Sequence, residues 1–216
     1  MSTADLTPLK AGSLPQQVVA ALKNAIFSRR LKPGDLIREA KIAIDLGVSQ
    51  NTVREALLEL QQSGLVVRSP NRSTIVTQLS NRDIEERVSV RLLLEPECIR
   101  LASHRMQPPD FKSLWKLIHQ MEEAKGPEAA HLDLNFHRVL WTCSGHRILA
   151  DTLEQLVLPL FAFVTIVRFS NVENLRALAA RHVTVIRALE SRNEEQLADV
   201  VRNHLTEHYQ DFLNQS

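Results

Sequence analysis

The 216-residue sequence has only two cysteines, 5% aromatic residues and a net charge of +1. Cys98 and Cys143 lie far apart inside helical patterns, which favours reduced core thiols and a cytoplasmic protein over a disulfide framework. The scarcity of aromatic residues argues against the base-stacking surfaces of single-strand nucleic-acid binders. No apolar run approaches the roughly 20 residues that cross a bilayer. The N-terminus also lacks a basic-then-apolar signal pattern, so we expect no membrane association.

The small net charge conceals an asymmetry along the chain. Residues 1–80 hold ten Lys and Arg against six Asp and Glu, whereas residues 81–216 hold sixteen against nineteen. A basic front half and a mildly acidic back half suit a DNA reader joined to a second, different domain. The length suits one large or two small domains with a core of ordinary size.

Residues 36–76 contain the clearest local pattern. A short apolar segment ends at Gly47, after which Ser49 or Asn51 can cap a new helix. Gly64 offers the left-handed residue that commonly follows a helix. The apolar residues of this helix recur at three- and four-residue spacing on one face, and they are Val53, Ala56, Leu57 and Leu60. The pattern predicts a helix-turn-helix, whose second helix fits the major groove of double-stranded DNA.

Two β-prone runs follow the predicted helix-turn-helix. They are Leu65–Val67 and Thr74–Thr77, and a turn-rich, basic tip separates them. A hairpin in this place is a wing, from which Arg68 and Arg72 can reach phosphate or a minor groove. The alternative is a small three-helix domain whose hairpin has no part in binding.

These segments resemble the GntR family of bacterial transcription regulators. The supporting stretches are LKPGDLI (31–37), LGVSQNTVREALLELQQSGLV (46–66) and PNRSTIV (70–76). The resemblance implies a homodimer on a palindromic DNA operator, with contacts from the wing residues Arg68 and Arg72 and from the helix residues Ser49, Gln50, Asn51, Thr52 and Arg54. Two positions depart from the family pattern: Gln50 replaces an arginine and Ser73 replaces a glycine. Because Gln pairs with adenine whereas Arg prefers guanine, Gln50 bears on the operator sequence.

The chain beyond residue 80 has a helical pattern throughout, with breaks at proline, glycine and asparagine. The expected helices span 81–105, 108–124, 127–143, 146–168, 173–191 and 194–214. We therefore predict a mainly α protein with a winged helix-turn-helix, a small β-hairpin wing and a C-terminal six-helix antiparallel bundle. The predicted boundaries are a flexible arm at 1–12, the DNA-binding domain at 13–79 and the helical domain at 80–216. We also expect His146 to cap a helix, and Trp115 and Trp141 to anchor the core.

The helical half carries a candidate metal site. Asp133 and His137 are four residues apart, so their side chains lie on one helix face. His182 and His204 lie at the edge of apolar stripes on two further helices, where buried imidazoles need partners. One shared cation would satisfy three imidazoles and a carboxylate, a donor set suited to Zn²⁺, Ni²⁺ or Mn²⁺. The alternative is a set of histidines hydrogen-bonded within a helical core.

This half also resembles the FCD ligand-binding domain of the FadR-type branch of GntR regulators, in a form close to the shorter VanR-like one. The marks are RLLLE (91–95), DLNFH (133–137), HVTVIRAL (182–189) and NHL (203–205). The resemblance implies a divalent metal on Asp133, His137, His182 and His204, and a small carboxylate metabolite as effector. Arg91 and Arg168 are the candidate effector-binding residues, because a guanidinium matches a carboxylate. For Arg91, an ion pair with Glu95 is an equally good interpretation.

The leading functional hypothesis is a ligand-responsive transcription regulator, and repression is the commoner behaviour in such a family. The second is a metal-dependent enzyme of the hydrolase type with a DNA-binding tether, although the sequence offers no catalytic residue beyond the metal ligands. The third is a regulator whose metal is purely structural. Loss of the metal would then unfold the helical domain.

Overall fold

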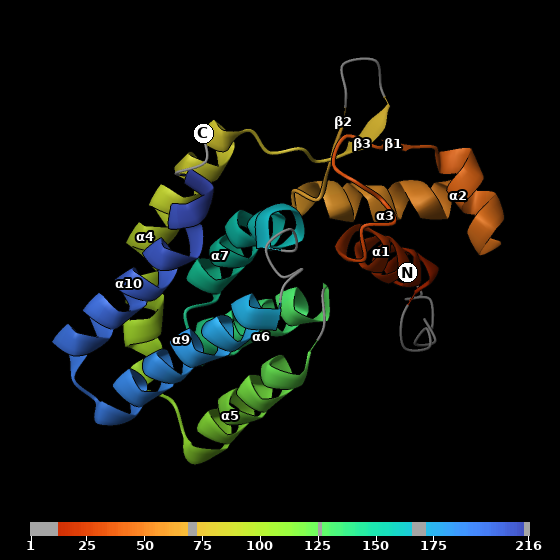
Figure 1. Cartoon of the computed structure of the whole chain (residues 1–216). Coiled ribbons are helices and arrows are strands. Elements are labelled where there is room, and N and C mark those ends of the chain that lie inside the picture. The colour runs from red at the N-terminus through yellow and green to blue at the C-terminus, as the bar shows by residue number, and fades with distance from the viewer. Residues whose placement is uncertain (1–12, 69–72, 125–126, 166–171, 214–216) are drawn as a thin grey trace, which may run out of the picture. The chain divides into compact units, whose positions relative to one another are not determined.

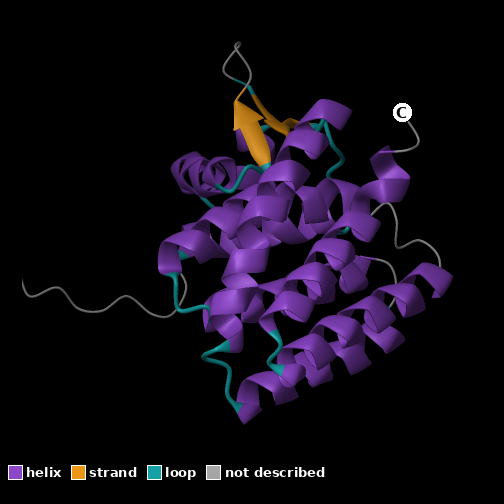
Figure 2. Ribbon diagram, turned by 90° about the vertical axis from the view of Figure 1, so that its left-hand side faces the viewer, coloured by secondary structure: helices purple, strands orange, loops and turns teal. Residues whose placement is uncertain are grey.

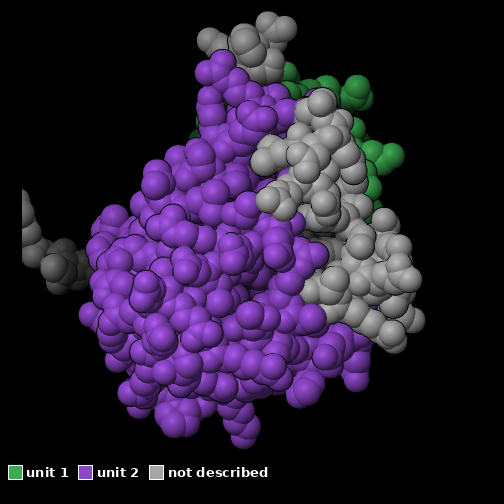
Figure 3. Space-filling model, turned by 60° about the vertical axis from the view of Figure 1, so that its left-hand side comes forward, with its two compact units in different colours: residues 1–77 green, residues 78–216 purple. Residues whose placement is uncertain are grey.

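The computed structural model describes residues 13–68, 73–124, 127–165 and 172–213. The predicted arm at 1–12 lies outside these ranges. The chain divides into two compact units, Met1–Thr77 and Gln78–Ser216, which Figure 3 colours separately. Among the described residues, no helix is both long and apolar enough to cross a membrane.

The first unit combines three helices with a small sheet (Figure 1). In chain order its elements are α1 (Leu14–Phe27), β1 (Leu36–Ile37), α2 (Glu39–Leu46), α3 (Gln50–Gln62), β2 (Val66–Arg68) and β3 (Thr74–Val76). Helices α1 and α2 both pack against α3. The buried face of α3 is the one that its spacing predicts, namely Val53, Ala56, Leu57 and Leu60.

The turn between α2 and α3 follows from two residues. Gly47 ends α2 in the left-handed conformation, at φ 65°, which glycine adopts without a steric cost. Ser49 then caps α3, because its hydroxyl accepts a hydrogen bond from the backbone N–H of Thr52 at 3.1 Å. The chain therefore reverses within a few residues and points the polar start of α3 outward.

The sheet has three antiparallel strands in the order β1–β3–β2, drawn as arrows in Figure 2. The predicted hairpin is present as β2 and β3, with Val66 opposite Val76. The sequence interpretation missed β1, which pairs Leu36 with Ile75. A strand of two residues has no alternation to detect, and this one directly follows a turn.

The second unit is helical. Its elements are α4 (Asn81–Ser103), α5 (Pro108–Glu123), α6 (Pro127–Cys143), α7 (Arg147–Leu160), a π-helical turn η1 (Phe161–Thr165), α9 (Val172–Ser191) and α10 (Glu194–Leu213). Helix α4 packs against α6, α7 and α10, and α5 packs against α6 and α9. The predicted mainly α class, with a winged helix-turn-helix followed by a helical domain, is confirmed. The predicted segment 146–168 corresponds to α7 and η1, and its last three residues lie outside the described ranges.

Local chemistry sets the helix ends in this unit. Ser80 caps α4, and Asp83 reaches back to the Ser80 backbone N–H at 2.8 Å. His146 caps α7 as predicted, because its Nδ1 accepts from the backbone N–H of Leu149 at 3.2 Å. Pro159 removes one backbone donor near the end of α7, and the π turn begins two residues later.

The two tryptophans have different environments. Trp141 is buried in the core, as predicted. The prediction for Trp115 is wrong, since this residue is half-buried and its indole N–H donates to Glu190 at 3.2 Å. Its position on α5 falls between the buried residues Leu114 and Ile118 and the exposed face. The amphipathic indole bridges core and solvent there.

Candidate functional site

Four buried polar side chains from three helices meet inside the second unit. Helix α6 supplies Asp133 and His137 one turn apart, α9 supplies His182 and α10 supplies His204. Each of the four is at most 6% exposed. These are the four residues predicted as metal ligands, and the fold brings all of them together.

The donor atoms converge on one small volume. His182 Nε2 lies 3.0 Å from Asp133 Oδ1, and His137 Nε2 lies 3.5 Å from the same oxygen. The Nε2 atoms of His137 and His204 are 3.4 Å apart. One nitrogen of each of the three imidazoles lies within 4.8 Å of the others.

These separations suit a divalent cation. Two ligand atoms that each lie about 2.1 Å from one ion are separated by roughly 3.0 to 3.4 Å in octahedral or tetrahedral geometry. The shortest observed separations fall in or near this range. Three imidazoles and a carboxylate also form the N/O donor set that zinc, nickel and manganese accept. The donor set therefore suits a metal ion in its chemistry. The spacing of the three imidazoles, with Asp133 Oδ1 within 3.5 Å of two of them, is compatible with one ion.

A buried ion pair borders the cluster on the side of α4. Glu95 is fully buried and Arg91 is 1% exposed. Arg91 Nε donates to Glu95 Oε2 at 2.5 Å, so the ion pair expected from the i, i+4 spacing is present. Arg91 also donates to the hydroxyl of Tyr209 at 2.8 Å, and its Nη2 lies 3.2 Å from His137 Nε2. The same guanidinium is thus both an ion-pair partner and a neighbour of the cluster.

Glu95 contacts the cluster directly as well. Its Oε1 accepts a hydrogen bond from His137 Nδ1 at 2.6 Å and another from the indole N–H of Trp141 at 2.9 Å. Aromatic rings close the surroundings: Phe136 packs edge-on against His182 at 4.4 Å, and Arg91 lies 5.4 Å over the ring of Phe161. The polar cluster is therefore set in a largely apolar enclosure.

Burial and charge together set the protonation of this network. Burial acts to raise the pKa of Glu95, but the charges and hydrogen bonds of Arg91 and His137 together outweigh it and hold that pKa far below its ordinary value. Burial acts to lower the pKa of His137, whereas the neighbouring Glu95 charge raises it, with a net rise. Burial raises the pKa of Tyr209 to about 12. Glu95 is thus an ionised acceptor and Tyr209 keeps its proton at neutral pH.

Sequence reasoning missed Glu95 and Tyr209 as parts of this site. Glu95 could have been noticed, because it lies on the same face of α4 as Arg91 and the neighbouring positions Val88 and Ile99 are apolar and buried. Tyr209, the only tyrosine of the chain, could also have been noticed, because it continues the four-residue spacing of the buried apolar residues Val201 and Leu205 on α10. Of the two predicted effector-binding residues, Arg91 borders the cluster, and Arg168 lies outside the described residues.

The leading end of α3 is the second candidate site. Gln50 and Asn51 are exposed, but Asn51 donates to Glu55 at 2.8 Å. Arg54 forms an ion pair with Glu39 of α2 at 2.7 Å. Ser49 and Thr52 are tied to one another by the cap, with their hydroxyls 2.9 Å apart.

The wing contributes one described arginine. Arg68, at the end of β2, is exposed and lines a small hollow of about 140 Å³ together with Arg54 and Thr74. Arg72 lies outside the described residues. The predicted DNA-contacting residues that the structure describes therefore lie on α3, its cap and strand β2.

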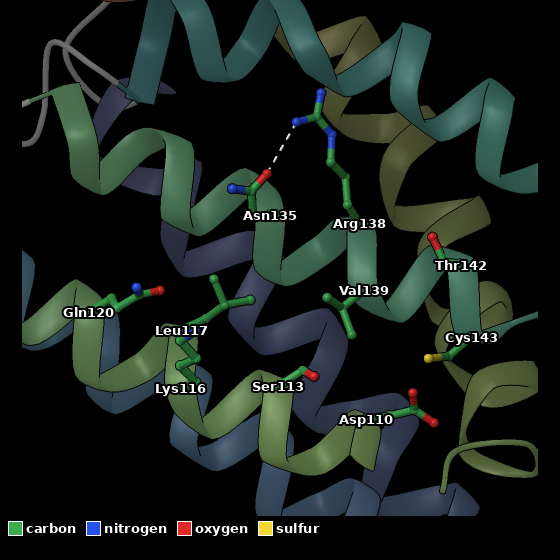
Figure 4. Close-up of a pocket in the computed structure, with 10 residues that line it drawn as sticks. All are labelled: Asp110, Ser113, Lys116, Leu117, Gln120, Asn135, Arg138, Val139, Thr142 and Cys143. Carbon is green, nitrogen blue, oxygen red and sulfur yellow. Dashed lines mark hydrogen bonds between the residues drawn. The ribbon is translucent and has the colours of Figure 1, made fainter. Parts of the chain in front are cut away.

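An open groove of about 540 Å³ lies between α5 and α6, shown in Figure 4. Arg138 donates to Asn135 at 3.2 Å and forms an ion pair with Glu154 of α7. Burial raises the pKa of the Cys143 thiol to about 11, so this thiol stays protonated at neutral pH. The four residues of the buried cluster do not line this groove.

Comparison with known proteins yields two family matches. Residues 14–76 match the model for bacterial regulatory proteins of the gntR family, and residues 86–207 match the FCD domain. The Escherichia coli K12 transcriptional regulator McbR is 30% identical over 152 residues, 68% of this chain and 69% of McbR. The E. coli K12 transcriptional repressor RspR is 26% identical over 201 residues, 91% of this chain and 86% of RspR.

A solved structure shares the fold along nearly the whole chain. The structure of E. coli McbR/YncC superimposes with a TM-score of 0.82 at 24% identity, covering 95% of this chain and 99% of that one. The likeness thus extends over both units.

Proposed function

The chain belongs to the gntR family of bacterial regulatory proteins and carries an FCD domain, and from that premise we propose that it is a metabolite-responsive transcriptional repressor. A homodimer binds a palindromic operator through α3 and the wing, and a small carboxylate bound at a metal in the FCD domain alters operator affinity. The family consists of transcription regulators, not enzymes, so the enzyme alternative is dropped. Action on the chromosome also fits the expected cytoplasmic location.

The observation that carries the proposal is the presence of two kinds of site in one chain. An exposed polar helix start follows a tight turn, as required of a recognition helix. A buried set of one carboxylate and three imidazoles lies in the other unit. Repression is favoured by the likeness to RspR, which is named a repressor.

Operator reading is assigned to the side chains at the start of α3. The Gln50 side chain is exposed and makes no hydrogen bond to another described residue, so it is available for a base edge. The other residues of the set are assigned contacts to phosphates or bases, for which Arg54 must exchange its ion-pair partner Glu39. They are Ser49, Asn51, Thr52, Arg54, Arg68 and Arg72.

Effector binding is assigned to the region beside the buried cluster. A divalent ion held by Asp133, His137, His182 and His204 would act as a Lewis acid that accepts a carboxylate oxygen. Arg91 is close enough to the cluster, at 3.2 Å from His137 Nε2, to pair with the same carboxylate. Arg168 stays a candidate from the sequence.

The effect of the carboxylate on operator affinity follows from a difference between its affinities for two arrangements of the dimer. If the carboxylate binds one arrangement of the dimer better than the other, it shifts the population toward that arrangement, and operator affinity changes by the same free energy. A ligand with equal affinity for both arrangements would leave repression unchanged.

The test is fluorescence anisotropy of a labelled duplex from the upstream region of the protein's own gene, beside a scrambled duplex, at two salt concentrations. We expect binding that is tighter than to the scrambled duplex by about 10³ or more. Equal and steeply salt-dependent binding to both duplexes would indicate phosphate attraction alone and contradict operator recognition at this locus. With the specific complex in hand, small carboxylates are added, with and without Zn²⁺, to find those that change its affinity.

A further inference from the structure

Glu95 is a fully buried carboxylate next to the proposed metal centre, outside the proposed ligand set. Three donors converge on it from two helices. His137 Nδ1 and the indole N–H of Trp141 donate to Oε1, and Arg91 Nε donates to Oε2. A bare ion-pair partner for Arg91 would not require the two bonds to α6.

The contacts of His137 assign the position of its proton. The Glu95 carboxylate only accepts hydrogen bonds here, so Nδ1 of His137 carries the proton. On the other side of the ring, Arg91 Nη2 lies 3.2 Å from Nε2, and a guanidinium only donates. Glu95 and Arg91 therefore both favour the tautomer with the lone pair on Nε2, whereas the Asp133 carboxylate, which also only accepts, opposes it from the longer distance of 3.5 Å.

That lone pair faces the cluster. His137 Nε2 lies 3.4 Å from His204 Nε2 and 3.5 Å from Asp133 Oδ1. A histidine can bind a metal ion only through an unprotonated nitrogen. The opposite tautomer would present an N–H to the centre and remove His137 from the ligand set.

We propose that Glu95 is the positioning residue of the metal centre: it fixes the tautomer and the ring orientation of His137 so that Nε2 is a ready ligand. This inference rests on the metal centre of the proposed function. Carboxylates that accept from the second nitrogen of a ligand histidine raise its basicity and typically contribute 10- to 100-fold in metal affinity. Arg91 occupies the same lone pair, so an ion must displace the Arg91 Nη2 contact.

The test compares two variants of the full-length protein. Glu95→Gln replaces one acceptor oxygen with an amide, which leaves too few acceptors for the three donors. Trp141→Phe is the matched control, because it removes another donor from the same Glu95 oxygen and leaves the bond to His137 in place. Zn²⁺ affinity is measured by competition with a chromophoric chelator. We expect Glu95→Gln to weaken binding by about 10- to 100-fold and Trp141→Phe to change it by less than about threefold.

Nitrogen-15 NMR of the metal-free protein gives a second readout that needs no affinity. The wild-type signal of His137, assigned by its absence in His137→Gln, is expected to show the Nδ1–H tautomer, and Glu95→Gln is expected to lose it. An Nε2–H tautomer in the wild type overturns the inference even if Glu95→Gln does not fold. Equal Zn²⁺ affinity in Glu95→Gln and Trp141→Phe overturns it with the centre intact. Wild-type protein that binds no Zn²⁺ overturns the metal centre itself, and the inference with it.

Discussion

Arg91 holds a positive charge that solvent does not reach, and Glu95 is the carboxylate that compensates it. Removing one partner of such a pair leaves an unpaired buried charge, which typically costs about 3–5 kcal/mol. We therefore expect Arg91→Met to lower the free energy of unfolding by about that amount, as measured by urea denaturation. The substitution also removes the hydrogen bond from Arg91 to Tyr209 of α10 and the contact with His137 of α6. It therefore affects the packing of α4 against both of these helices.

The same helix supplies the control for this prediction. Arg82 and Glu86 of α4 form a pair with the same spacing and the same residue types, but their side chains are 85% and 64% exposed. Exposed ion pairs contribute roughly 0–1 kcal/mol, so Arg82→Met is expected to change stability by less than about 1 kcal/mol. Similar losses in the two variants would show that the buried pair has no special role in stability.

At the residue scale, the sequence predicts which residues share one face of a helix, but it does not predict which helices pack against one another. The i, i+4 spacing of Asp133 and His137 placed both on one face of α6, as found. No periodicity relates these residues to His182 and His204, because the helix pairing that joins them depends on packing between distant segments. Their inclusion rested on imidazoles at the edges of apolar stripes, which need partners if buried, and the resemblance to the FCD domain supported it. The prediction that Trp115 anchors the core is wrong for a similar reason, since its half-buried position depends on which faces of α5 the neighbouring helices cover.

At the scale of elements, α3 offers a test of base recognition. Gln50 is exposed at the first residue of this helix, where recognition helices contact base edges. Glutamine can bond adenine through two hydrogen bonds, whereas arginine bonds guanine, and such a pair discriminates by about 1–3 kcal/mol. We expect Gln50→Arg to shift the preferred base from adenine to guanine at one symmetric position of the operator.

This shift is measured by competition among duplexes that differ at single base pairs. Gln62→Arg is the control, because it adds the same charge at the far end of α3, where the helix terminates. It is expected to strengthen binding to all duplexes alike through phosphate attraction. An unchanged base preference in Gln50→Arg would remove Gln50 from the set of base-reading residues.

The sequence predicts the boundaries of helices where the terminal residues form caps or adopt the left-handed conformation. Ser49, one of the two caps that the sequence offers for α3, and His146 each cap the expected helix, and Gly47 adopts the left-handed conformation that ends α2. Strand β1 has no such local signal. Its two residues are held by pairing with β3, where Leu36 lies opposite Ile75 and Ile37 opposite Thr74, 39 and 37 positions further along the chain. Only the folded sheet therefore reveals this strand.

At the scale of the whole molecule, the hypothesis of a purely structural metal requires that the proposed ion hold the second unit together. The core of this unit includes many buried apolar side chains besides the cluster, among them Leu134, Leu140, Val157, Ile186, Leu189 and Leu205. The neighbouring charges of Arg91 and Glu95 also compensate one another without an ion. We therefore expect the helical unit to stay folded when the metal is removed, in contrast to small domains that fold only with their metal.

Zn²⁺ should stabilise a helical unit that already folds without it. Because an ion that binds only the native state stabilises it by mass action, Zn²⁺ at 100 times its Kd should add about 2.7 kcal/mol and raise the Tm. A chelator should reverse this rise while far-UV circular dichroism at 25 °C keeps the helical signal. His182→Gln should abolish the Zn²⁺ effect, and His119→Gln, at an exposed site on α5, should retain it. Loss of the helical signal on chelation would instead make the metal structural, and the effector would then need a binding site of its own.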